Sequence, residues 1–136
     1  MPSNAVALDS SILIEHFRIK NKDNSLLSRL LPKFEELCIS PLVLYEILIG
    51  HTESPIFDSN AVLSKLTLLP FGEADVIRAA AIHRTLKKAN KLIDHFDVFI
   101  AATAIVHALP LATLNRKHFE RIEGLMLFDA ENRSTG

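Results

Sequence analysis

The sequence has little cysteine or glycine, no tryptophan and no long hydrophobic run: it contains one cysteine and four glycines. The single cysteine, Cys38, excludes an internal disulfide. Its place in the apolar run 37–39 predicts a buried thiol in a reducing, cytoplasmic setting. No segment approaches the roughly 20 apolar residues of a membrane span, and the first apolar run, residues 5–8, lacks a basic leader. We therefore expect a soluble, unprocessed protein that does not associate with membranes.

Several common kinds of site are also absent. The 15 Lys and Arg residues are offset by 16 Asp and Glu residues, so the charge balance neither implies nor excludes a nucleic-acid partner. The six histidines form no H-E-x-x-H motif and are not accompanied by several cysteines, which argues against a zinc site. The sequence also lacks a Gly-rich phosphate loop and a G-x-S-x-G motif, so ordinary nucleotide-binding and serine-hydrolase functions lose their support.

What the chain does have is an alternation of short apolar strands and helices. Strands are predicted at 5–8, 37–39, 67–69, 111–112 and 125–128. Helices are predicted from Ser10 to His16, from Ser25 to near Pro32, from Pro41 to Gly50, through Leu66 after a loop at 52–60, from Glu73 to Asn90, from the Asp94–Asp97 turn towards Pro110, and at 116–122. Residues 18–24 are predicted to be a loop.

This alternation predicts an α/β fold, because no hairpin signal separates the strands. The expected architecture is a three-layer α/β/α sandwich around a parallel sheet. The chain is 136 residues long and 49% hydrophobic, which suits a single domain over 1–130. Residues 131–136 are predicted to be a flexible polar tail.

Three carboxylates interrupt apolar segments: Asp9, Glu46 and Asp97. Burying an unpaired carboxylate is costly, so each needs a partner or an ion. Taken singly, Asp9 could cap a helix, Glu46 could pair with a lysine at a rim, and Asp97 could be a first-turn acid. Taken together, they follow strands that end at one edge of a parallel sheet. Oxygen ligands gathered at one edge describe a site for Mg²⁺ or Mn²⁺.

Four segments resemble the PIN-domain ribonucleases, and within them the small VapC-type toxins of toxin–antitoxin pairs. They are VALDSSILI (6–14), ISPLVLYEILIG (39–50), DVFIAATA (97–104) and LPLATLNRKHFERI (109–122), in that order. The resemblance spans nearly the whole chain. It implies the same α/β/α fold and a Mg²⁺- or Mn²⁺-dependent endoribonuclease, which is a hydrolase of phosphodiester bonds. It also implies a cognate antitoxin partner and a homodimer.

Carried over position by position, Asp9, Glu46 and Asp97 look like the metal-binding acids of that family. Thr113 and Asn115 fall on its T-x-D/N segment. The expected catalytic residues are therefore Asp9, Glu46, Asp97 and Asn115, with Glu46 as a ligand or general base.

Other residues are expected to support this site or to contact RNA. Thr113, Ser11 and Asp94 are expected to orient the ligands. Arg116, Lys117 and Arg121 are the basic residues nearest the site in sequence and the candidates for guiding RNA. A further strip, comprising Arg84, Lys87, Lys88 and Lys91, is better explained as a solvated helix face.

The chain departs from the family pattern at two positions. Asn115 replaces an aspartate of many relatives, and His118 stands where VapC-type relatives often have an acid. A neutral amide can still accept a hydrogen bond or position a water, so we expect weaker metal binding and retained chemistry.

Two other functions remain to be weighed. One is a catalytically silent PIN-like module that binds RNA or a protein. The other is a receiver or phosphatase-like α/β domain, but Asp9-Ser10-Ser11 lacks the paired first-strand acids of such sites. For partner binding, apolar surface is expected on Leu26, Leu27, Leu30 and Leu31 and on the helix 42–49.

Overall fold

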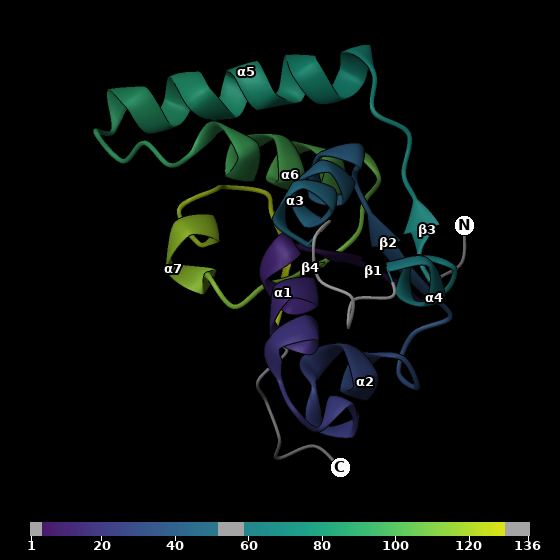
Figure 1. The fold of residues 1–136 in the computed structure, drawn as a ribbon. Helices are drawn as coiled ribbons and strands as arrows, with labels where there is room; N and C mark the ends of the chain where they lie inside the picture. Colours follow the sequence, from purple (N-terminus) through teal and green to yellow (C-terminus); the bar gives the residue numbers. More distant parts are fainter. Residues whose placement is uncertain (1–3, 52–58, 130–136) are drawn as a thin grey trace.

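The computed structural model describes residues 4–51 and 59–129, which form a parallel sheet of five strands flanked by helices (Figure 1). The strands are β1 (Ala5–Leu8), β2 (Glu36–Ile39), β3 (Thr67–Leu68), β4 (Leu111–Ala112) and β5 (Leu127–Phe128). Their order is β3-β2-β1-β4-β5, and every neighbouring pair is parallel. The α/β/α architecture predicted from the sequence is confirmed.

Seven α-helices and one 3₁₀ turn connect these strands in the described ranges. They are α1 (Ser10–Arg18), the 3₁₀ turn (Lys22–Asn24), α2 (Leu26–Leu30), α3 (Pro41–His51), α4 (Ser59–Leu63), α5 (Glu73–Lys88), α6 (His95–Val106) and α7 (Arg116–Phe119). The predicted loop at 18–24 therefore contains one 3₁₀ turn. The predicted tail, 131–136, and most of the predicted loop at 52–60 lie outside the described residues.

Three helices end earlier than predicted, and two of these ends have a visible backbone cause. After α5, Asn90 takes a left-handed φ of 56° and Lys91 donates its N–H to the Leu86 carbonyl (2.9 Å), which closes the helix at Lys88. After α7, the Ile122 N–H turns back to the Phe119 carbonyl (3.0 Å), and Gly124 follows at φ 88°. Helix α4 ends at Leu63, short of Leu66. The last strand begins at Leu127, two residues later than predicted.

The buried core forms one hydrophobic cluster, and helix α6 lies largely within it. Its side chains Val98, Ile100, Ala101, Ala102 and Ala104 are buried, as expected, although Val106 at its end is 38% exposed. Figure 1 shows α5 lying across α6, and these two helices make the most extensive helix–helix contact. Cys38 is buried, as predicted, and burial followed by the nearby Glu36 raises the pKa of its thiol to about 11.

The prediction of apolar partner surface on the first leucine cluster is wrong. Leu26, Leu27 and Leu30 are only 4%, 3% and 2% exposed, because α2 packs against α1 and directs them into the core. The other part of the same prediction, exposed apolar side chains on the helix 42–49, agrees with α3, where Tyr45, Leu48 and Ile49 are 52%, 40% and 62% exposed. None of the helices in the described part of the chain is long and apolar enough for a bilayer crossing.

The order in which successive strands are added to the sheet reverses between β1 and β4. From β1 the chain proceeds outwards to β2 and β3, then returns through α5 and α6 to β4 on the opposite side of β1. Leu8 pairs with Ala112, and the Asp9 N–H donates to the Ala112 carbonyl (3.0 Å). In open α/β sheets, ligands bind at such a switch point, beyond the carboxyl ends of the strands.

The burial of α2 gives a direct test of the corrected leucine assignment. Leu30→Ala should lower the free energy of unfolding by about 2–5 kcal/mol, because it removes a fully buried side chain from a closely packed core. Leu92→Ala, at a side chain that is 49% exposed, serves as the control and should change it by less than about 1 kcal/mol. Urea unfolding followed by circular dichroism measures both. Equal effects at the two positions would contradict the packing of α2.

Candidate active site

Asp9 is held at the carboxyl end of β1 by side chains, and it does not cap α1. It occupies the N-cap position of α1, yet its carboxylate accepts no capping hydrogen bond from the backbone N–H groups of that helix. Its Oδ2 atom instead accepts hydrogen bonds from Thr113 Oγ1 (2.7 Å) and Ser11 Oγ (2.8 Å). Since the residue is only 1% exposed, these two hydroxyls compensate much of the cost of burying a carboxylate.

The two hydroxyls also tie the ends of β1 and β4 together. Ser11 Oγ accepts the N–H of Leu114 (3.0 Å), and Thr113 Oγ1 accepts the N–H of Asn115 (2.9 Å). Each hydroxyl therefore donates to Asp9 while it fixes the backbone that leads into α7. Ser11 and Thr113 therefore hold the Asp9 carboxylate in place in this structure.

Glu46 reaches the same region from α3. The residue is half-buried, and its Oε1 atom is buried with no hydrogen-bond partner. Burial, and then the charge of Asp9, raises the pKa of the Glu46 carboxyl, with smaller contributions from Asp97 and Asp94, while hydrogen bonding from Ser10 opposes the rise. No lysine accounts for this shift, so the lysine-paired rim position considered for Glu46 gains no support here.

Two acids, Asp94 and Asp97, lie at the start of α6, and only Asp94 caps the helix. Asp94 is the N-cap residue, and its Oδ2 atom accepts the N–H of Phe96 (3.1 Å). On α5 the equivalent first-turn acid, Asp75, bonds back to the N–H of Gly72 (2.8 Å). Asp97 shows no such bond to the backbone in the described structure. Asp94 therefore caps the helix, and the Asp97 carboxylate takes no part in the capping.

Asp97 is paired with a histidine that sequence analysis had noted only as a departure from the family pattern. His118 Nδ1 on α7 lies 3.5 Å from Asp97 Oδ2. Burial, followed by the charges of Asp9 and Asp94, raises the pKa of Asp97 to about 6, and His118 opposes this rise. The charges of Asp9 and Asp94 thus raise the pKa of Asp97, and the charge of Asp97 in turn raises the pKa of Glu46.

The segment after β4 brings further polar groups to this edge. Asn115 is exposed at the N-cap position of α7, and its side chain does not cap that helix. Arg116 follows it, and its Nη1 atom is buried with no hydrogen-bond partner. Lys117 is exposed on the same short helix. Asn115 and Arg116 are therefore placed by the same backbone that Ser11 and Thr113 hold.

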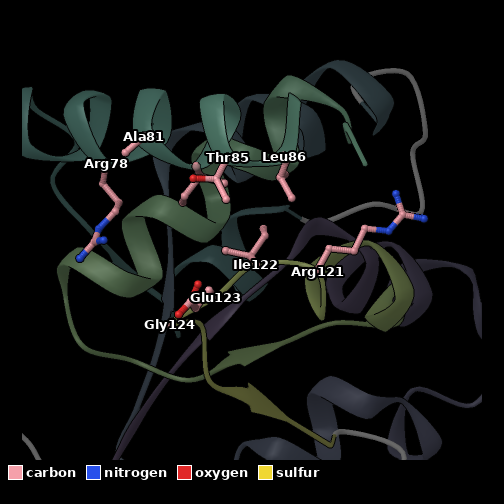
Figure 2. Close-up of a pocket in the computed structure, with 9 residues that line it drawn as sticks. Arg78, Ala81, Thr85, Leu86, Arg121, Ile122, Glu123 and Gly124 are labelled. Atoms are coloured by element: carbon pink, nitrogen blue, oxygen red, sulfur yellow. The ribbon is translucent and has the colours of Figure 1, made fainter. Parts of the chain in front are cut away.

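Arg121 belongs to a different feature. It lines a cavity of about 350 Å³ between α5 and the turn after α7, together with Arg78, Thr85, Leu86 and Ile122 (Figure 2). None of the site acids lines this cavity. Arg121 Nη1 also lies 3.5 Å from the Lys91 carbonyl. The three basic residues predicted to contact RNA therefore do not form one cluster, because Arg121 is directed towards α5.

The oxygen atoms at the sheet edge suit a hard divalent cation in their chemistry. Asp9, Glu46 and Asp97 supply only carboxylate oxygens, which Mg²⁺ and Mn²⁺ prefer, and Glu46 Oε1 lacks a partner of its own. Within residues 4–51 and 59–129, however, no three His, Cys, Asp or Glu side chains are close enough together to share an ion.

Sequence analysis missed two contacts of this site. His118 pairs with Asp97, and Ser10, predicted only as the first residue of a helix, hydrogen bonds to Glu46. The available signal was the histidine in a position where the related pattern has an acid. Such a residue could be recognised as part of the site, but the identity of its partner depends on how α7 packs against α6.

Comparison with known proteins gives the family. The PIN domain family matches residues 6–125. The chain is 36% identical over 136 residues to Ribonuclease VapC1 of Rickettsia felis, covering 93% of this chain and 96% of that protein. It is 32% identical over 132 residues to Ribonuclease VapC1 of Methanocaldococcus jannaschii, covering 91% of this chain and 87% of that one.

A solved structure agrees with the sequence matches. The DNA-bound VapBC structure from Salmonella typhimurium contains a chain that superposes on this fold with a TM-score of 0.79 at 26% identity, covering 93% of this chain and 98% of that one. The match extends over the parallel sheet and the helices that carry the acids. This chain belongs to the PIN-domain family and, within it, to the VapC ribonucleases.

Proposed function

We propose that this protein is a metal-dependent endoribonuclease toxin whose active site is the edge formed by Asp9, Glu46 and Asp97. The observation that carries the proposal is electrostatic. Burial, and then the charge of Asp9 at the end of β1, raises the pKa of Glu46 on α3 and of Asp97 on α6, beside the switch point between β1 and β4. Such clustering of buried like charges destabilises a folded protein and is typical of functional sites.

Asp9, Glu46 and Asp97 would hold Mg²⁺ or Mn²⁺, which would supply charge stabilisation at the scissile phosphate and a water of lowered pKa. In the proposed reaction, the chain's own groups position the reactants. Glu46, whose pKa is raised, would accept the proton of the attacking water as the new P–O bond forms. The leaving oxygen would depart with the electron pair of the broken P–O bond and take a proton from solvent. Asn115 would position that water, and the unpartnered Arg116 Nη1 would bind a phosphate oxygen.

The supporting residues have separate roles in this scheme. Ser11 and Thr113 fix Asp9, and Asp94 fixes the start of α6 so that Asp97 faces the site. His118 offsets part of the negative charge of Asp97, from which it lies 3.5 Å away. Many relatives carry an additional acid at this position. Lys117, exposed on α7, would attract the RNA backbone from solvent.

The partner is proposed from the relatives. The superposed Salmonella structure is named as a VapBC complex, and we propose an antitoxin partner for this chain as well. The exposed apolar side chains Leu48 and Ile49 on α3 would contribute to contacts with a partner or with a second copy in a homodimer. A catalytically silent RNA-binding module is the alternative function, and cleavage assays separate the two.

Asp97→Asn should abolish RNA cleavage while leaving the fold intact, because it removes one ligand charge and almost no volume. Removing one directly participating group is expected to lower the rate by at least about 100-fold. The partner-free protein is incubated with a mixed RNA pool and Mg²⁺, Mn²⁺ or chelator, and the new ends are mapped. Glu73→Gln, at an exposed first-turn acid of α5, is the matched control and should cut at the parental rate.

Two results of this assay would contradict the proposed site or the proposed function. Parental cleavage by Asp97→Asn would remove Asp97 from the site. No cleavage by the parent in either metal, together with binding of the same RNA, would favour the silent module.

Metal should stabilise the parent more than Asp97→Asn. A cation that binds only the folded state contributes about 2.7 kcal/mol at a hundredfold excess over its dissociation constant, and the variant should lose much of that gain. Thermal unfolding of both proteins in chelator and in excess Mn²⁺ measures the difference. Equal Mn²⁺ shifts would mean that Asp97 does not bind the ion.

The metal-free proteins should also differ in their pH dependence. The pKa of Asp97 is raised from 3.8 to about 6 on folding, so its favourable contribution is present below pH 3.8 and is lost as pH rises through about 6. In chelator, the parent should therefore become less stable relative to Asp97→Asn over that rise. Thermal melts across this pH range provide the measurement, and a constant difference between the two proteins would contradict the repulsion among the acids.

A further inference from the structure

An exposed aromatic side chain on α3 directly neighbours a site acid in the chain. Tyr45 is the only tyrosine of a chain that has no tryptophan, and it is 52% exposed. No phenylalanine in the described ranges is among the exposed large hydrophobic residues. Tyr45 directly precedes Glu46 on α3, so an exposed phenol ring lies next to that acid in the chain.

Tyr45 is backed by a second ring from the helix that carries Asp97. Its ring lies parallel to that of Phe96, with an interplanar angle of 2° and 6.0 Å between ring centroids. Phe96 directly precedes Asp97, and its N–H is bonded to the capping Asp94 (3.1 Å). The contact between α3 and α6 therefore brings together one aromatic residue and one acid from each helix.

This aromatic pair is held more firmly than an isolated exposed ring. Phe96 is only partly exposed, and its backbone is fixed in the first turn of α6 by the Asp94 cap. Stacking on Phe96 restricts the motion of Tyr45 before any ligand arrives, which lowers the entropy cost of binding at its exposed side.

We propose that the stacked Tyr45–Phe96 pair binds a nucleobase of the single-stranded RNA next to the scissile phosphate. This subsite rests on the proposed ribonuclease function and extends it to the kind of RNA segment that is bound. A base is favoured over a phosphate because Glu46, Asp94 and Asp97 lie next to these two residues, or two positions away, in the chain. Their negative charge repels a phosphate and leaves an uncharged π-face unaffected. Aromatic side chains stack well on bases that are not paired in a duplex.

The proposal predicts a preference for unpaired RNA with little preference for one base. Every base has a face that can stack, whereas a paired base within a helix is covered by its neighbours. The acids would then act on the phosphate beside the stacked base. Cleavage should accordingly occur in loops and single strands.

The composition of the chain supplies a direct probe of this stacking. Tyr45→Trp introduces the only tryptophan, which can be excited at wavelengths where nucleobases do not absorb. The substitution is made together with Asp97→Asn, in Mg²⁺, so that the RNA stays intact. A short single-stranded RNA should quench the tryptophan, and a backbone oligomer of the same length that lacks bases should not do so at equal occupancy. Duplex RNA should quench it much less.

Binding and kinetics of further variants test the same subsite without fluorescence. In the Asp97→Asn background, Tyr45→Ala should weaken binding of the single-stranded RNA by about 5- to 100-fold, and Tyr45→Phe by less than about twofold. In the parent background, Tyr45→Ala should raise KM and leave kcat nearly unchanged, because uniform binding is lost. Ile77→Ala, at an apolar side chain of α5 that is 61% exposed, is the control and should leave RNA binding unchanged.

The outcomes separate this subsite from the enzyme activity itself. RNA that is bound and cut by the parent, with no quenching of the tryptophan, overturns the subsite and leaves the ribonuclease in place. RNA that is neither bound nor cut by the parent overturns the proposed function. Equal losses of binding for Tyr45→Ala and Ile77→Ala would also overturn the subsite. A loss for Tyr45→Ala that is accompanied by a change in oligomeric state would assign this face to a protein contact and overturn the subsite as well.

Discussion

The parallel pairing of β1 with β4 is the constraint on which the rest of the site depends. It joins strands that are about a hundred residues apart in the chain and sets Leu8 against Ala112. Since side chains that follow paired strands emerge at the same edge, Asp9 and Thr113 become neighbours, and the hydroxyls of Thr113 and Ser11 can then hold the buried carboxylate. Because the pairing of β1 with β4 fixes the position of Asp9, the acids of α3 and α6 lie near a carboxylate that is held in place.

The same arrangement carries an electrostatic cost that the fold distributes among several groups. One oxygen of Asp9 is compensated by two hydroxyls, Asp94 by a backbone amide, and Asp97 in part by His118. Glu46 Oε1 receives no such compensation in the described structure. A site that leaves one buried oxygen unpaired, and raises the pKa of two acids, is less stable than it could be without them. This is the pattern expected where function opposes stability.

Sequence patterns were sufficient to predict the parallel sheet and the acids near its edge, because each depends on local features. Asp9 after a fully apolar strand, and Asp94 and Asp97 before a buried helix, can be recognised without tertiary information. The surface was harder to predict, since Leu26, Leu27 and Leu30 look like an exposed cluster until α2 is seen to pack on α1. The pairing of His118 with Asp97 was likewise beyond local reasoning, because α7 is only four residues long and its orientation is set by the packing of Phe119 in the core.

The hydrogen bond between Thr113 and Asp9 spans 104 positions of the chain. During synthesis on a ribosome, the amino-terminal strand emerges long before Thr113 exists, so Asp9 cannot obtain its second hydroxyl partner until Thr113 has left the exit tunnel. The edge proposed as the active site is therefore assembled late in synthesis. For a ribonuclease with this site, such an order of assembly would leave the nascent chain without a complete site while only the segments before Thr113 have emerged from the ribosome, which is itself rich in RNA.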